Sequence, residues 1–148
     1  MCIRDRYRTL KPGGTAVVTT WKHMGYVEAW REELAKVKPD VKVPPGGVIS
    51  EGWLKEETIK DCLVQGGFDA SYVKIKSAEH SFVFGTMTAD GSEVMKGMLM
   101  KAIYAANDGK FTDEEKKVFN EKMEERLQQN AKNNKSFPMV AWVAAVTK

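Results

Sequence analysis

Apolar residues cluster in three short runs that predict β-strands. The runs are Thr15–Thr20, Ala70–Ala78 and Met139–Val146, and each follows a glycine or a proline within a few residues. Short bounded runs of this kind are typical of strands. The first run is continuous rather than alternating, which favours a strand buried on both faces of a parallel sheet. The segment His80–Gly85 either continues the second strand or forms a separate edge segment.

Between the strands, apolar residues recur every three or four positions, which predicts helices. The predicted helices are one that ends at Tyr7–Leu10, then Tyr26–Lys38, about Leu54–Gln65, Ser92–Ala106 and Thr112–Asn133. The segment Val41–Ile49 is rich in proline and glycine and is predicted to be a loop. The order strand, helix, helix, strand, helix, helix, strand indicates an α/β fold with a layered sheet.

The same periodicity separates core positions from polar ones on these helices. The predicted core positions are Val27, Trp30, Leu34 and Val37, then Ile59, Cys62 and Leu63, and on the last helix Phe119, Met123 and Leu127. Glu33 falls on a polar face, and the mixed charges of the last helix, such as Glu121 and Arg126, are interpreted as a solvated surface. Thr112 and Glu115 have the spacing of a capping box.

The net charge of +3 comes entirely from the start of the chain. The whole sequence has 23 basic and 20 acidic side chains. Residues 1–11 hold four of the basic ones and one acidic one, Asp5. Residues 12–148 therefore hold 19 basic and 19 acidic side chains. A nucleic-acid-binding protein carries its positive charge as a patch on the folded surface. The neutral body therefore argues against nucleic acid as a partner.

The length of the apolar runs argues against a membrane-spanning protein, and the cysteines argue against a metal-binding or disulfide-rich one. The longest apolar run, Met139–Val146, has eight residues, whereas a membrane-spanning helix needs about 20. Cys2 and Cys62 form neither a metal-ligand spacing nor a disulfide framework. We therefore expect no membrane partner, no metal and, by default, a cytoplasmic location. The opening Met1–Arg6 resembles a translated adapter sequence and is interpreted as a non-native leader, with a single domain over 7–148.

The segment from Arg8 to Trp21 carries the strongest family signal. Its sequence, RTLKPGGTAVVTTW, resembles the stretch that enters the fifth strand of class I S-adenosylmethionine-dependent methyltransferases. Gly66-Gly67-Phe68 is similar to the turn that introduces strand six of that family. Met139–Lys148 then corresponds to strand seven, which is antiparallel and inserts beside strand six. A helical insertion over about residues 90–134 would cover the pocket as a lid.

The resemblance implies a partial Rossmann-like sheet, consisting of the last three strands, covering helices and the helical insertion. It implies methyl transfer from S-adenosyl-L-methionine to a small-molecule substrate. The acidic, glycine-rich loop with which the family binds its cofactor has no counterpart in this sequence, so no cofactor-binding residue is assigned here and the fragment alone is expected to be inactive. Gly13-Gly14 lacks the spacing of a phosphate-binding loop and is interpreted as a structural turn.

Candidate site residues follow the first predicted strand. Trp21, Lys22 and His23 come just past its carboxyl end, where open α/β sheets bind their ligands. His23 is the candidate general base, because a histidine pKa lies near neutrality; the alternative is a solvated histidine beside a Trp21 that packs on the sheet. Trp21 and Trp30 are candidates for the substrate pocket, with Trp30 alternatively a core residue. His80 is assigned no role.

The sequence is also compatible with a second class of function, a non-catalytic protein that binds a partner. Met95, Met98 and Met100 in one predicted helix suit either an adaptable apolar lid or an irregular core. A sheet without its fourth strand would expose an unpaired edge, which predicts self-association. The alternative is therefore a non-catalytic interaction module or accessory subunit that uses this edge and the methionine-rich helices.

Overall fold

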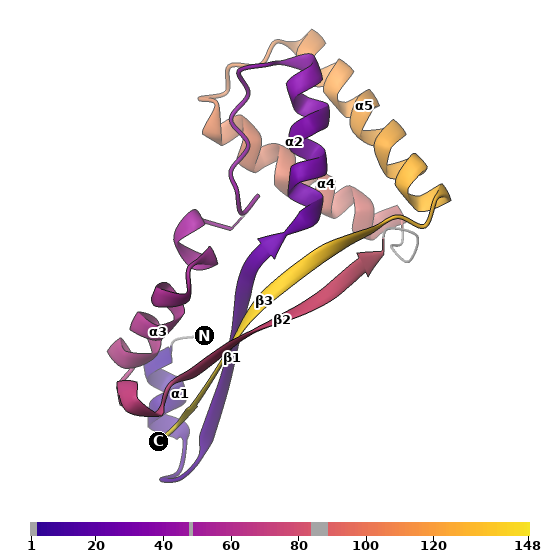
Figure 1. The fold of residues 1–148 in the computed structure, drawn as a ribbon. Coiled ribbons are helices and arrows are strands. Elements are labelled where there is room, and N and C mark those ends of the chain that lie inside the picture. Colours follow the sequence, from indigo (N-terminus) through magenta and orange to yellow (C-terminus); the bar gives the residue numbers. More distant parts are fainter. Residues whose placement is uncertain (1–2, 48, 84–88) are drawn as a thin grey trace. The chain divides into compact units, whose positions relative to one another are not determined.

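The computed structural model describes residues 3–47, 49–83 and 89–148, which form a mixed α/β fold with five helices and a three-stranded antiparallel sheet (Figure 1). The helices are α1 (Ile3–Thr9), α2 (Gly25–Val37), α3 (Glu56–Gln65), α4 (Ala89–Ala106) and α5 (Asp113–Lys132), with short 3₁₀ turns η1 (Glu51–Leu54) and η2 (Ala70–Tyr72). The strands are β1 (Thr15–Met24), β2 (Lys74–Val83) and β3 (Ser136–Thr147).

The last strand lies in the middle of the sheet. The strand order is β1-β3-β2, with antiparallel neighbours throughout (Figure 1). The three predicted strands and the antiparallel last strand are confirmed. The expectation that β1 is buried on both faces of a parallel sheet is wrong, because its burial alternates: Ala16 is 7% exposed and the next residue, Val17, is 55% exposed. Alternation of this kind is typical of an antiparallel strand with one covered face.

The bounds of two strands differ from the predicted ones for local reasons. β1 continues to Met24, four residues beyond the predicted end at Thr20. β2 starts only at Lys74, because the Asp69 carboxylate accepts hydrogen bonds from the Ser71 backbone N–H (2.8 Å) and hydroxyl (2.7 Å). Such local side-chain bonds compete with extended structure and stabilise the η2 turn instead. Residues His80–Val83 continue β2, and residues 84 and 85 lie outside the described residues.

The chain divides into two compact units. The sheet unit comprises Met1–His23, Glu51–His80 and Met139–Lys148, and the helical unit comprises Met24–Ser50 and Ser81–Pro138. The helical unit thus contains α2 in addition to the α4 and α5 of the predicted insertion. Ile3–Arg6, in the expected leader, are part of α1, and Ile3 packs against the core of the sheet unit.

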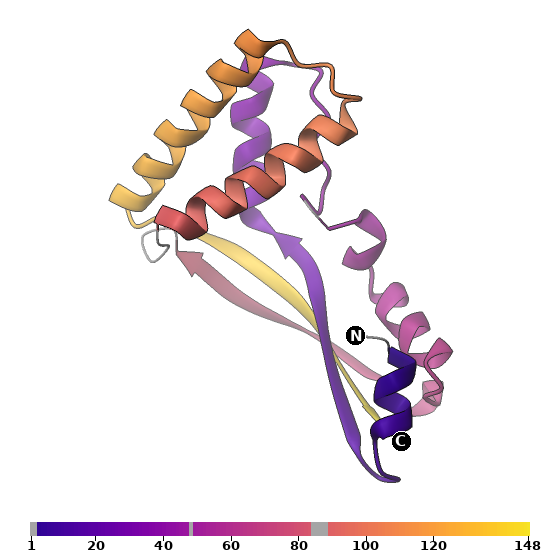
Figure 2. The same ribbon diagram turned by 180° about the vertical axis from the view of Figure 1, so that it is seen from behind.

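One face of the sheet packs on α1 and α3, which lie side by side (Figure 2). The buried residues of this core are Ala16, Ile59, Leu63, Phe68, Ala144 and Val146. The turn that leads from α3 into the core depends on glycine, since Gly67 has φ +108°, a conformation that other residues rarely adopt. It lets the Phe68 N–H donate to the Leu63 carbonyl oxygen at 3.2 Å, closing the end of α3.

Lys148 joins the last strand to the first helix. Its ammonium group donates to the carbonyl oxygens of Tyr7 (2.8 Å) and Leu10 (2.9 Å) and lies 4.5 Å from the centre of the Tyr7 ring. Its backbone pairs with Gly13 and Gly14 at the start of β1. A cation at the end of a helix stabilises the carbonyl groups that lack partners within that helix. The Lys-Pro-Gly-Gly turn is therefore fixed by the far end of the sequence.

In the helical unit, α2 packs along α5 (Figures 1 and 2). Its largest fully buried side chains are Val27, Trp30, Leu34, Leu99, Ile103, Phe119 and Met123. The predicted apolar stripes of both helices are thereby confirmed. The capping box of Thr112 and Glu115 is present, and Glu115 also accepts a hydrogen bond from Lys38, the residue that follows α2, at 2.8 Å. The Lys38 ammonium, followed by the Thr112 backbone N–H, lowers the pKa of Glu115.

Candidate functional site

The candidate residues after the first strand lie within it. Trp21, Lys22 and His23 belong to β1, which ends at Met24, so their predicted position past the carboxyl end is wrong. The strand is longer because β3 pairs with it, and of the four added residues the aromatic Trp21 favours extended structure. Side chains alternate along a strand, so Thr20 and Lys22 point to one face and Trp21 and His23 to the other.

The Lys22 face of β1 forms a corner with β3 and η1. The Thr20 hydroxyl donates to the Trp53 carbonyl oxygen at 3.0 Å, and the Trp142 indole N–H donates to the Leu54 carbonyl oxygen at 2.8 Å. The Lys22 ammonium lies 4.3 Å from the centre of the Trp142 ring, within range of a cation–π interaction. Sequence reasoning missed Trp142, whose one signal is an aromatic residue inside an otherwise aliphatic strand.

His23 and Trp21 are not fixed by polar partners. Trp21 is 37% exposed, and His23 is half-buried without a side-chain hydrogen bond to any described residue. A general base has to reach the proton that it removes from the substrate. The structure leaves the His23 ring unbonded to its neighbours, and its catalytic role stays a prediction.

Trp30 is a core residue of the helical unit, as one of its two interpretations predicted. Its side chain has no exposed surface, and its ring meets Tyr26 edge-on at 5.9 Å between centroids. Burial raises the pKa of Tyr26, so this phenol is neutral at physiological pH. The Trp30 indole N–H is buried and has no hydrogen-bond partner among the described residues. Trp21 and His23 belong to the other unit.

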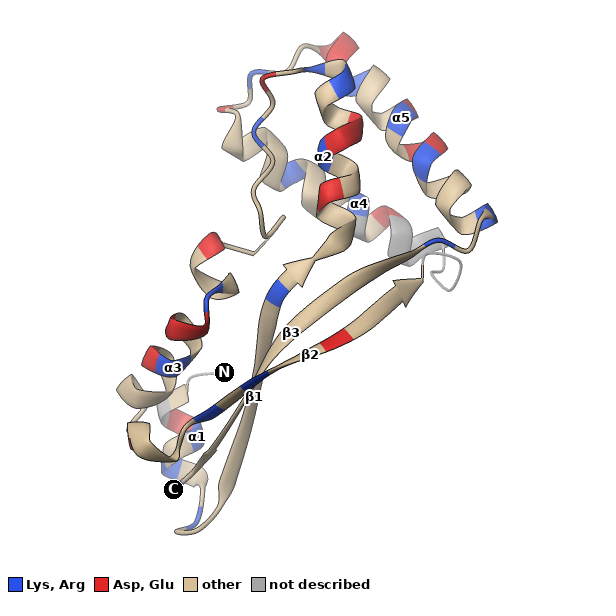
Figure 3. Cartoon of the chain, viewed as in Figure 1, with Lys and Arg blue, Asp and Glu red and all other residues tan. Residues whose placement is uncertain are grey.

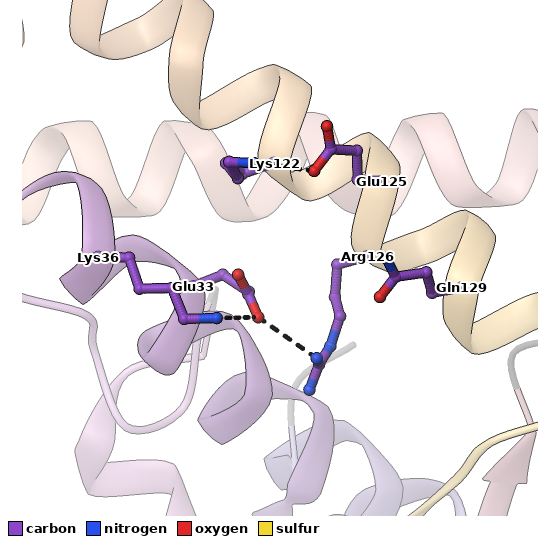
Figure 4. Close-up of a pocket in the computed structure, with 6 residues that line it drawn as sticks. All are labelled: Glu33, Lys36, Lys122, Glu125, Arg126 and Gln129. Atoms are coloured by element: carbon purple, nitrogen blue, oxygen red, sulfur yellow. Dashed lines mark hydrogen bonds and ion pairs between the residues drawn. The ribbon is translucent and has the colours of Figure 1, made fainter.

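A polar pocket lies between α2 and α5 (Figure 4). It has a volume of about 250 Å³ and is lined by Glu33, Lys36, Lys122, Glu125, Arg126 and Gln129. Glu33 is only 6% exposed, and one of its carboxylate oxygens accepts a hydrogen bond from the Lys36 ammonium at 2.8 Å. The same oxygen forms an ion pair with the Arg126 guanidinium at 3.3 Å. Lys122 pairs with Glu125 on α5 at 3.0 Å. The pocket therefore contains three cations and two carboxylates.

The predicted solvated faces of α2 and α5 meet at this pocket, so their interpretation as purely solvated surfaces is wrong for Glu33 and Arg126. Arg126 pairs across the interface with Glu33, and Glu115 pairs across it with Lys38. The buried Glu33 carboxylate is tolerated because Arg126 on the facing helix supplies a cation. The spacing of charges within one helix does not predict which of them will pair with a residue of another helix.

Two donors on α5 are left without acceptors in the described part of the chain. The Arg126 Nε and the Asn130 side-chain amide nitrogen are both buried and unpaired. Asn130 follows Arg126 by one helical turn, so the two donors lie on the same side of α5. Buried polar groups in folded proteins normally have a partner. This side of α5 thus carries two buried donors without a partner among the described residues.

The remaining sequence candidates are the methionines of α4 and His80. On α4, Met100 is buried whereas Met98 is 54% exposed, and the side chain of Met95 lies outside the described residues. His80 is exposed on β2. Within the described ranges, no three histidine, cysteine or acidic side chains group as a metal would require, and no helix combines the length and apolar character of a membrane span.

Comparison with known proteins assigns no family to this chain. No protein-family model matches the sequence, and no curated protein matches it significantly.

Proposed function

We propose that this chain is the carboxy-terminal part of a class I S-adenosylmethionine-dependent methyltransferase that acts on a small molecule. The observation that carries the proposal is the position of β3. This strand is last in the sequence, antiparallel to its neighbours, and inserted beside β2, as the resemblance requires of strand seven. The Lys-Pro-Gly-Gly turn before β1 and the Gly-Gly-Phe turn before β2 stand at the corresponding places.

The outer edge and one face of β1 support a sheet with further strands. β1 is an outermost strand in the order β1-β3-β2, and its first seven residues carry no charge. The other outermost strand, β2, carries Lys74, Lys76 and Glu79 (Figure 3). Charged side chains are a common protection of natural edge strands. On β1, the exposed Val17 and Trp21 share a face, which fits a strand prepared for covering by other elements.

The residues present do not fit the cofactor by themselves. A family member holds S-adenosyl-L-methionine with backbone N–H groups of a glycine-rich loop that follows a strand. Here Gly13 and Gly14 precede β1, and their N–H groups donate to the carbonyl oxygens of Lys148 and Lys11. In the proposed enzyme the cofactor is held by segments outside this sequence. This chain contributes the end of the sheet, the helical unit and the candidate base His23.

Cofactor binding tests the proposal. The reading frame upstream of Tyr7 is first determined from the 5′ end of the source transcript. We expect it to encode further strands, and we expect the longer protein, but not the 148-residue chain, to bind S-adenosylhomocysteine in isothermal titration calorimetry. Failure of the longer protein to bind, or a transcript that starts at Met1, would overturn the proposal.

A second function is supported by the same edge. If no cofactor is bound, the β1 edge, which carries no charge over its first seven residues, suits an interaction module that pairs with another strand, including that of a second copy. We then expect the chain to self-associate and Val17→Lys to reduce the association, because a charge on an exposed edge strand opposes pairing. Sedimentation velocity over a range of concentrations measures this.

Val118→Lys is the matched control for the edge, since Val118 is 42% exposed on α5 and lies in the helical unit. An equal effect of both lysines, or a monomer at all concentrations, would exclude the β1 edge as the association surface.

A further inference from the structure

The pocket between α2 and α5 becomes more buried from its mouth to its floor. The exposed fraction of the side chain falls from 64% for Lys36 and 46% for Lys122 to 23% for Arg126 and 8% for Glu33. The two lysines are thus accessible to solvent, whereas the guanidinium lies deeper. A ligand that enters would meet the ammonium groups first.

The charges of this pocket do not balance. Glu125 is paired with Lys122, whereas Lys36 and Arg126 share one oxygen of Glu33. Among the six lining residues, one positive charge is therefore in excess, and the Nε–H of Arg126 has no acceptor among the described residues. An arginine presents its donors in a planar fork that matches the two oxygens of a carboxylate or a phosphate.

We propose that the α2–α5 pocket binds a small oxyanion, held by Arg126 and by the ammonium groups of Lys36 and Lys122. The volume of about 250 Å³ suits a carboxylate or phosphate group with a small substituent. A cationic ligand is disfavoured by the positive excess, and an apolar one would leave the charged lining without partners. The oxyanion would supply an acceptor for the Arg126 Nε–H. The proposal does not rest on the proposed methyl transfer, because it is argued from the lining residues of the helical unit, whereas the candidate base His23 lies in the sheet unit.

Nuclear magnetic resonance of the full 148-residue chain tests the site with sodium phosphate and sodium acetate as separate probes. Chloride is exchanged for each anion at constant ionic strength, so that general screening stays unchanged. The signal of the Arg126 Nε–H group, assigned by its loss in Arg126→Lys, is expected to shift in a saturable manner. Lys122→Gln is expected to weaken the affinity about tenfold, the usual effect of losing one charged hydrogen bond.

Lys116→Gln is the matched control. Lys116 lies on the same helix and forms the same kind of ion pair at a spacing of three, with Asp113, but it does not line the pocket. The Lys116→Gln variant should bind each anion with the same affinity as the unchanged chain. Saturation by phosphate alone or by acetate alone would support the site and identify the headgroup. No saturable shift with either probe, or equal affinities of the Lys122→Gln and Lys116→Gln variants, would overturn the proposal.

Discussion

Replacing Trp30 with alanine is expected to lower the free energy of unfolding by about 3–5 kcal/mol, the range measured for large aromatic residues in protein cores. Trp30 has no exposed surface and packs edge-on against Tyr26 in the helical unit. Its removal leaves a cavity, because the surrounding helices relax only in part. Urea unfolding followed by far-UV circular dichroism measures the change.

Trp21→Ala is the matched control for this prediction. Trp21 is 37% exposed on β1, so the same truncation removes less buried surface and should change the free energy of unfolding much less. Equal effects of the two substitutions would contradict the assignment of Trp30 to the core. A small effect of Trp30→Ala on stability, combined with a loss of ligand binding, would instead support the interpretation of Trp30 as a substrate-pocket residue.

Replacing Glu33 with glutamine is the second large expected effect. The substitution keeps the size of the side chain and leaves Lys36 and Arg126 without their shared carboxylate. Removing one partner of a buried ion pair destabilises by about 3–5 kcal/mol. The lower end is expected here, because both cations retain some exposure to solvent. Urea unfolding of the two proteins gives the difference.

The neighbouring Glu32→Gln controls for the change of net charge. Glu32 is exposed and forms no ion pair with a described residue, so its substitution should stay within about 0.5 kcal/mol. In the double variant Glu33→Gln/Arg126→Met, the loss should be smaller than the sum of the single losses, since the unpaired guanidinium is removed as well. Additive losses would show that Glu33 and Arg126 do not stabilise each other.

The elements of the fold were largely predictable, because they depend on local patterns. Two features of α5 depend only on residues within that helix and are confirmed. They are the capping box at Thr112 and the apolar stripe of Phe119, Met123 and Leu127. The end of β1 was not predictable to the residue. Lys22 and His23 are neutral in their preference, and their extended conformation is set by pairing with β3, which lies more than 100 residues away.

The polar pocket was not predictable for a related reason. Glu33 has the spacing of a solvent-facing residue on α2, and its burial arises only when α5 docks against that face. No pattern within α2 specifies which helix will cover it. For Trp30, the place on an apolar stripe indicated the core as one of two interpretations, and the structure shows that this one is correct. Periodicity within an element thus predicts which face is apolar, and the partners of polar residues depend on tertiary structure.

The division of the chain has a consequence for how it can be cut. Three segments of the sheet unit alternate with two of the helical unit, so the backbone passes from one to the other four times. A single protease cleavage, for example between Ser50 and Glu51, leaves three covalent connections intact. Neither unit can be obtained as a continuous fragment. A gene encoding the helical unit alone would have to join Ser50 to Ser81 through a new linker.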